Sequence, residues 1–202
     1  MSEAMNTSQE TLRGSLSDVR TKGRGNGRVE QNGDLERLLN PSPLLRKFEP
    51  TPDKMKAVAR HLMDNELSMS DEYRDYDIIY GILNKYLGGG NSIFYEIGDM
   101  DGVFGFTDII PGWKAHAIFE LINPKIWSKQ LVRESRALFD LIMKTGDLLK
   151  VSSQTADKRI AKMAGMIGFV LEGIRRVEFS WDNKPYDIYM IGRFRGNEKE
   201  EA

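Results

Sequence analysis

The sequence of 202 residues contains no cysteine and only two histidines. Without cysteine the chain can form no disulfide, no thiolate metal site and no cysteine nucleophile. Neither His61 nor His116 has neighbours at the spacing of a metal site or a catalytic triad. We therefore predict no metal site and expect both histidines to be structural.

Long apolar runs are also absent. No segment approaches the roughly 20 apolar residues that a membrane-spanning helix needs, and the polar N-terminus lacks the apolar region of a signal peptide. The formal net charge of −1 gives no bias towards nucleic acid or anionic membrane. We expect a soluble, cytoplasmic protein with no specific nucleic-acid or membrane partner.

Residues 1–42 contain no aromatic side chain and are rich in serine, glycine, asparagine and charge. Such a segment cannot bury enough apolar surface to fold, so we predict a flexible N-terminal tail. Its basic run, residues 20–28, is open to two interpretations: contact with phosphates, or a solvated tail. Residues 34–40 are a candidate helical turn for binding a protein partner or the chain's own domain. Residues 43–196 are then the folded domain, and residues 197–202 a charged C-terminal tail.

Hydrophobic periodicity predicts a mixed α+β domain. Thr51 and Pro52 provide an N-cap and a first helical residue, and Gly168 provides a left-handed stop after the last helix. The predicted strands are 44–49, 92–97, 103–110, 115–122, 148–152, 169–181 and 186–194, and the predicted helices begin at 51, about 70, 129 and about 155. In the last hairpin, period-two alternation places Val177, Phe179 and Trp181 on one face.

The closing segment resembles a known family. The residues that carry the resemblance are Gly168, Phe169, Glu172, Gly173, Tyr186 and Asp187. In this order they are similar to the end of the GCN5-related N-acetyltransferases (GNAT), above all the ribosomal-protein alanine N-acetyltransferases. The resemblance extends over about residues 44–195, and it implies a mostly antiparallel twisted sheet flanked by helices. It also implies transfer of an acetyl group from acetyl-CoA to an amine, for example a protein N-terminus.

In this family acetyl-CoA lies where the fourth and fifth strands separate, with its pyrophosphate at the start of the third helix. The resemblance places the contacts at Leu121, Ile122, Lys125, Ser128, Lys129, Gln130, Leu131 and Asp157. The glycines of the family's phosphate loop are missing, since Ser128 and Gln130 stand at the two small positions. Lys125 and Lys129 offer charge instead, whereas Ser128 could serve simply as an N-cap.

Two glutamates are candidate bases for removing a proton from the amine. Glu178 precedes Phe179, as does a glutamate that can act as base in the N-terminal acetyltransferases, and Glu120 lies on the fourth strand near the expected thioester. For both, the alternative is a polar residue on a solvated strand face. Two other family positions carry Ile160 and Ala164 in place of a serine and a tyrosine.

Two functions remain open at this stage. The first is an acetyl-CoA-dependent N-acetyltransferase. The second is a non-catalytic interaction or assembly protein, for example a phage-encoded one, that keeps the GNAT shape without the acetyl-CoA loop. A sensor that binds acyl-CoA without turnover is a third hypothesis.

Overall fold

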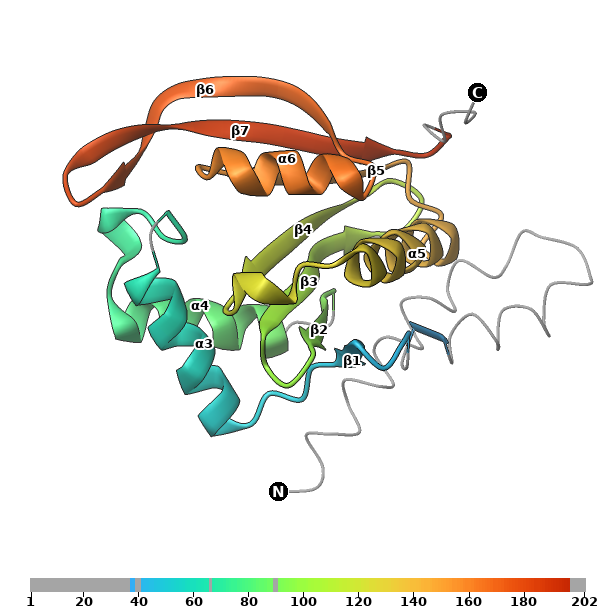
Figure 1. The fold of residues 1–202 in the computed structure, drawn as a ribbon, viewed down its shortest axis with the longest axis horizontal. Helices are drawn as coiled ribbons and strands as arrows, with labels where there is room; N and C mark the ends of the chain where they lie inside the picture. Colours follow the sequence, from blue (N-terminus) through green and yellow to red (C-terminus); the bar gives the residue numbers. More distant parts are fainter. Residues whose placement is uncertain (1–36, 39–40, 66, 89–90, 197–202) are drawn as a thin grey trace, which may run out of the picture.

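The computed structural model of this protein describes residues 37–38, 41–65, 67–88 and 91–196 (Figure 1). The predictions for residues 1–36, 39–40 and 197–202 lie outside the described residues. The described elements are β1 (Leu45–Lys47), α3 (Pro52–Asp64), η2 (Asp71–Tyr73), α4 (Tyr76–Gly88), β2 (Ile93–Ile97), β3 (Gly102–Ile110), β4 (Lys114–Leu121), η3 (Pro124–Ile126), α5 (Lys129–Thr145), β5 (Lys150–Thr155), α6 (Lys158–Met166), β6 (Val170–Trp181) and β7 (Lys184–Phe194).

The strands form one seven-stranded sheet in the order β1-β2-β3-β4-β5-β7-β6. Every neighbouring pair is antiparallel except β4 and β5, which are parallel. The predicted mixed α/β class with a mostly antiparallel sheet is confirmed. No helix among the described residues has both the length and the apolar character that crossing a bilayer requires.

Helices cover both faces of the sheet, so each face has its own apolar core (Figure 1). On one face, Phe139 of α5 packs against Phe104 and Phe106 of β3 with ring centroids 4.8 and 4.9 Å apart. On the other face, Met55 and Val58 of α3 pack with strand residues. The side chains of β4 alternate between these two cores, which places neighbouring residues of one strand in different surroundings.

Local signals for helix ends are confirmed. The Thr51 hydroxyl accepts a hydrogen bond from the backbone N–H of Lys54 at 3.4 Å, with Pro52 as the first helical residue. Gly168 has φ +95°, and a Cβ at this position would lie 3.1 Å from the Arg193 side chain. Only glycine satisfies both the backbone conformation and the space after α6.

The second helix begins later than the sequence predicts. It starts at Tyr76, because the Asp75 carboxylate accepts hydrogen bonds from the backbone N–H groups of Asp77 (3.0 Å) and Ile78 (3.1 Å) and so forms the N-terminal cap. Tyr73, which we expected on this helix, lies in the preceding η2 turn and is 48% exposed.

The predicted alternation of the last hairpin fails at a bulge. Between the pairs Arg175↔Ile188 and Phe179↔Tyr186, three residues of β6 oppose Asp187 alone. Val177 lies in this bulge with φ +55° and 69% exposure, whereas Trp181 is buried. Val177 lies inside the bulge, and its positive φ interrupts the extended alternation, so it does not share the surroundings of Trp181.

Leu38 lies within the segment predicted as tail and is buried in the core of the α5 face. Its carbonyl accepts a hydrogen bond from the Tyr95 hydroxyl at 3.0 Å. The predicted helical turn at residues 34–40 therefore includes at least one residue that packs on the chain's own domain.

Candidate functional site

Strands β4 and β5 separate part of the way along the sheet. Their parallel pairing runs through Lys114↔Lys150, Ala115↔Val151 and His116↔Ser152 and then ends. Beyond it, the Ser153 hydroxyl donates to the carbonyl of Ala117 at 2.8 Å, while β4 continues to Leu121. The last part of β4 therefore has a strand partner on one edge only.

A cavity of about 750 Å³ lies at this separation and extends to both faces of the sheet. One part, here called the α3/α4 half, is lined by those two helices and by His116, Ile118 and Glu120 of β4. The other part, the α5/α6 half, is lined by residues of those helices and by Ala117, Phe119 and Leu121. Because β4 contributes alternate residues to the two halves, its backbone lies where they meet.

Glu120 has a dense set of partners on the α3/α4 half. Its Oε1 accepts from the Ser68 hydroxyl at 2.6 Å and the Asn65 amide at 3.1 Å, and it lies 3.0 Å from Nε2 of His61. The side chains of Glu120 and His61 are each only 15% exposed. A carboxylate held by several donors has a defined position, and all three contacts are made to the same oxygen. Oε2 has no partner of this kind among the described residues.

His61, Asn65 and Ser68 come from the last turn of α3 and the segment after it. The C-cap Asn65 ends the helix, and its amide also donates to the Ser68 hydroxyl at 2.7 Å, so the polar side chains support one another. Sequence reasoning missed these three residues as part of a site. They lie more than 50 positions from Glu120, and no local spacing connects them with it.

The predicted phosphate loop lies beside the cavity. Ser128 caps α5 by accepting a hydrogen bond from the backbone N–H of Leu131 at 3.1 Å. Lys125 and Lys129 are exposed, and the Gln130 amide donates to Glu134 at 2.8 Å, along the helix. Leu131 is fully buried in the core.

Trp127 of the same loop does line the cavity, and its ring packs edge-on against Phe119 at 6.0 Å. Lys125, Ser128, Lys129, Gln130 and Leu131 do not line it. The cavity therefore ends at the Trp127 indole, and the two lysines lie outside it.

Asp157 caps α6, accepting a hydrogen bond from the backbone N–H of Arg159 at 2.7 Å. Burial alone would raise the pKa of Asp157, but hydrogen bonds from the side chain and backbone of Arg159 outweigh it and lower the pKa. Asp157, Leu121 and Ile122 line the cavity, as predicted contacts of a ligand there would.

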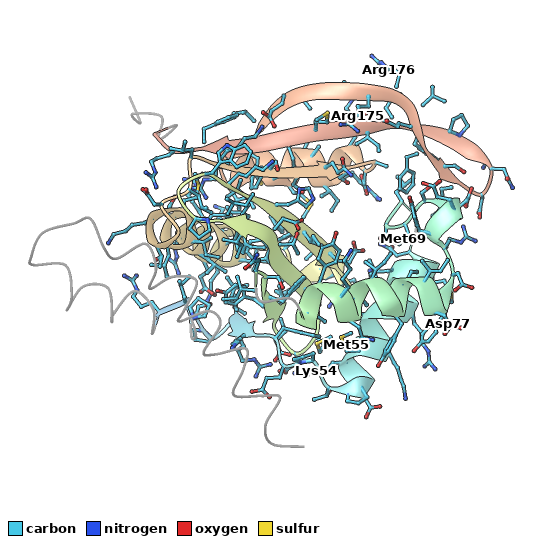
Figure 2. All side chains as sticks on the ribbon, turned by 180° about the vertical axis from the view of Figure 1, so that it is seen from behind. Lys54, Met55, Met69, Asp77, Arg175 and Arg176 are labelled. Carbon is cyan, nitrogen blue, oxygen red and sulfur yellow. The ribbon has the colours of Figure 1, made fainter. Side chains whose placement is uncertain are left out.

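Glu178 lies on the β6 bulge, away from the cavity lining. Its side chain is 50% exposed and lies 3.5 Å from Arg175. Figure 2 shows Arg176, which also lies in this bulge, pointing away from the body of the molecule. The structure thus brings Glu120, Leu121, Ile122 and Asp157 together and leaves Glu178 apart.

His116 lies at the last pair of the β4–β5 ladder and lines the cavity. Burial lowers the pKa of His116, and the opposing attraction of Asp108 is the smaller effect. The imidazole is therefore neutral near pH 7 and adds no positive charge to the α3/α4 half.

Comparisons with known proteins agree on the fold. The spermidine N-acetyltransferase from Vibrio cholerae, solved with CoA and spermine, matches 77% of this chain and 98% of its own with a TM-score of 0.57 and 15% identity. RimL, a ribosomal L7/L12 alpha-N-protein acetyltransferase solved with CoA, matches 77% of this chain and 97% of its own at TM-score 0.57 and 18% identity. A probable GNAT-family acetyltransferase from Chromobacterium violaceum matches 76% and 83% at TM-score 0.51 and 17% identity.

No family model and no curated protein matches the sequence. The structural matches nevertheless cover most of both chains, so this protein has the GNAT fold. Within that fold, the similarity extends equally to a polyamine enzyme and to an N-terminal protein acetyltransferase.

Proposed function

We propose that this protein is an N-acetyltransferase that transfers an acetyl group from acetyl-CoA to a primary amine, with Glu120 as the base. The observation that carries the proposal is the position of Glu120. Its carboxylate lines the cavity at the separation of β4 and β5 and is oriented by three donors. A fixed carboxylate next to a through-sheet cavity is suited to receiving a proton from a bound amine.

The chemistry follows from the order of proton and bond changes. An alkylammonium ion gives one proton to Glu120, directly or through a water, and its nitrogen lone pair attacks the thioester carbonyl. The C–N bond forms, the C–S bond breaks, and the leaving thiolate takes up the second proton that the nitrogen loses on becoming an amide. The oxyanion formed on the carbonyl needs a donor, which an unpaired backbone N–H at the free edge of β4 can supply.

Acetyl-CoA fits the α5/α6 half in part. The unpaired edge of β4 and the apolar walls offer a path for the pantetheine arm, because the amides of that arm can pair with a free strand edge. The phosphates would lie beyond Trp127, at the start of α5, beside the exposed Lys125 and Lys129. Those two charges and the helix N-terminus would then replace the close backbone contact of a glycine loop.

The acceptor we propose is a primary amine in the α3/α4 half. The two structural neighbours named by their acceptors act on spermidine and on a protein N-terminus, both of which carry a primary amine. For this chain we therefore propose the shared feature, a primary amine, and neither of the two named acceptors in particular. A protein N-terminus is one such primary amine.

A non-catalytic GNAT-shaped interaction or assembly protein is the second candidate. It is favoured by the positions of Lys125, Ser128, Lys129 and Gln130 outside the cavity lining. A thermal-shift titration with acetyl-CoA separates the two, since saturation to about a hundredfold over Kd stabilises a protein by about 2.7 kcal/mol. An upward shift together with amine-dependent thiol release supports the enzyme, and no shift at millimolar acetyl-CoA contradicts it.

The Glu120→Gln variant is the matched control for that titration. If Glu120 acts on the amine alone, this variant keeps the thermal shift and loses thiol release. Because the chain has no cysteine, all thiol detected comes from CoA.

A further inference from the structure

The α3/α4 half has mostly apolar walls. Leu62, Ile82, Leu83, Phe94 and Ile118 line it, from α3, α4, β2 and β4. Met69, on the segment between α3 and α4, adds a thioether near the hairpin (Figure 2). A ligand that enters this half therefore exchanges water for aliphatic and aromatic surface.

Among the lining residues that the structure describes, negative charge in this half is found at one place. Among the described lining residues, the carboxylates are Glu120 and Asp157, and Asp157 lies at the start of α6 with Arg159 bound to it. His116 is neutral near pH 7 because burial lowers its pKa. One ammonium group can thus pair with Glu120, and the described lining residues of the α3/α4 half offer no second carboxylate for another.

A second ammonium group would face the apolar walls. Moving an unpaired cation out of water costs far more than burying a methyl group stabilises, unless a partner charge compensates. An acceptor with two or more cations along its chain would therefore bind poorly with its reacting amine at Glu120.

The outer side of this half is held by a set of contacts between η2 and the tip of the β6–β7 hairpin. The Asp71 carboxylate accepts from the backbone N–H groups of Asp182 and Asn183, both at 3.0 Å, and from the Ser180 hydroxyl. Arg74 bonds Asp182 at 2.7 Å and lies over the Trp181 ring at 4.3 Å from its centroid. In Figure 1 the hairpin tip correspondingly bends towards the segment that precedes α4.

This η2–hairpin clamp restricts what can extend out of the cavity on that side. A peptide whose N-terminal amine sits at Glu120 needs an exit for the rest of its chain, and these contacts connect the two elements that would have to separate. A small acceptor that is enclosed completely needs no such exit.

We propose that the acceptor is a small primary monoamine carried on an apolar chain or ring. The inference rests on the proposed N-acetyltransferase function and deepens it. Glu120 binds the ammonium group, the walls of the α3/α4 half bind the apolar part, and the η2–hairpin clamp limits its size.

Two probes of equal length test the charge argument. Heptylamine and 1,6-diaminohexane differ in a terminal methyl group against a terminal ammonium group. With the full-length protein and acetyl-CoA, kcat/KM from thiol release should be at least about tenfold higher for heptylamine, which corresponds to about 1.4 kcal/mol. Equal or faster use of the diamine overturns the inference and leaves the acetyltransferase function intact.

A paired set of α4 variants sharpens this result. Leu83→Glu adds a carboxylate to the cavity wall and should raise the relative kcat/KM for 1,6-diaminohexane, whereas Ile78→Glu, exposed on the same helix and outside the lining, should leave the ratio unchanged. An unchanged ratio in a folded Leu83→Glu protein contradicts the binding mode. Should that variant not fold, Ile82→Glu, also in the lining, makes the same test.

A decapeptide with a free N-terminal amine tests the clamp. It should react slower than heptylamine with the wild-type protein, and Arg74→Ala should increase its use relative to heptylamine. A peptide that outcompetes heptylamine in the wild-type protein would instead identify the acceptor as a protein N-terminus.

Calorimetric titration of both amines in the absence of acetyl-CoA separates this inference from the proposed function. Tighter binding of heptylamine, abolished in Glu120→Ala, with no transfer in any assay, would retain the amine site and reject the transferase. Detectable transfer with a preference for the diamine would retain the transferase and reject the monoamine as its acceptor. If neither amine binds and no transfer is detected, both the inference and the proposed function are wrong.

Discussion

The two halves of the cavity differ in how tightly their polar groups are specified. In the α3/α4 half, one carboxylate has three donors from consecutive parts of the chain, all directed at the same oxygen. Beside the α5/α6 half, the loop expected to bind phosphates has an ordinary helix cap, a Gln130–Glu134 hydrogen bond along the helix and two exposed lysines. The end of the cavity suited to the amine is more closely defined than the end suited to the phosphates.

This difference indicates where specificity resides. A defined carboxylate discriminates between acceptors by geometry, whereas exposed surface lysines attract any polyanion with little geometric selection. We therefore expect the chemistry to be sensitive to single changes around Glu120 and the coenzyme affinity to be sensitive to salt.

The largest expected effect is on the base. Glu120→Gln should reduce kcat for acetyl transfer by about a hundredfold to ten-thousandfold, because a proton acceptor is replaced by a neutral amide of nearly the same shape. Thiol-release kinetics at saturating acetyl-CoA and heptylamine measure it.

Glu178→Gln is the matched control for that prediction. Since Glu178 is half-exposed on the bulge and outside the cavity lining, its kcat and its unfolding free energy should remain close to those of the wild-type protein. If kcat falls as much in Glu178→Gln as in Glu120→Gln, the assignment of Glu120 as the base and of Glu178 as a residue outside the site is wrong.

The next effect is on the support of Glu120. His61→Ala removes one of the three donors and should lower kcat about tenfold, since a hydrogen bond to a charged group is worth about 1.5 kcal/mol or more. The KM for acetyl-CoA should not change, because His61 is in contact with Glu120 and does not itself line the cavity.

His61→Gln can still donate to Glu120 and should recover part of the lost kcat. A kcat that falls equally in both variants, or a KM for acetyl-CoA that rises with it, would assign His61 a general structural role rather than a positioning one.

Much of the fold followed from local patterns. Thr51, Ser128, Asp157 and Gly168 mark helix ends through interactions within a few residues, and the structure has each of them in that position. The start of α4 and the β6 bulge were not predictable in this way. The first depends on which of several acidic residues caps the helix, and the second on a register that only β7 reveals.

Of the residues around Glu120, the sequence predicts only those on strand β4. Alternation along the fourth strand predicts that Glu120 and Phe119 face opposite sides, and the resemblance places Glu120 near the expected thioester. The partners of Glu120 arrive from α3 through tertiary packing, so no spacing in the sequence indicates His61, Asn65 or Ser68. For Glu178 the same kind of alternation failed, because the bulge removes the period on which it depends.

A smaller effect is expected on the phosphate side. The double change Ser128→Gly and Gln130→Gly should tighten acetyl-CoA binding severalfold, because glycine allows closer backbone approach at the helix N-terminus. Calorimetry at two salt concentrations checks it. The wild-type Kd should rise with salt more steeply than that of the double variant, since exposed lysines supply more of its affinity.

Loss of the Ser128 cap costs only a few tenths of a kcal/mol when glycine replaces serine, so the variant should remain folded. Unchanged affinity and unchanged salt dependence would show that the phosphates do not approach this helix, and the comparison between the two halves would lose its basis.

The smallest expected effect is at His116, where the two halves meet. Burial lowers the pKa of His116 below its ordinary 6.5, so the unfolded chain binds the proton at a higher pH than the folded one. Stability from this group is present above about pH 6.5 and is lost as the pH falls through that value towards the lower folded pKa.

Urea unfolding at pH 7.5 and 5.5 should therefore show a larger fall in the unfolding free energy for the wild-type protein than for His116→Gln. Equal falls in both proteins would mean that His116 is solvated in the folded state, and the α3/α4 half would then admit a positive charge at acidic pH.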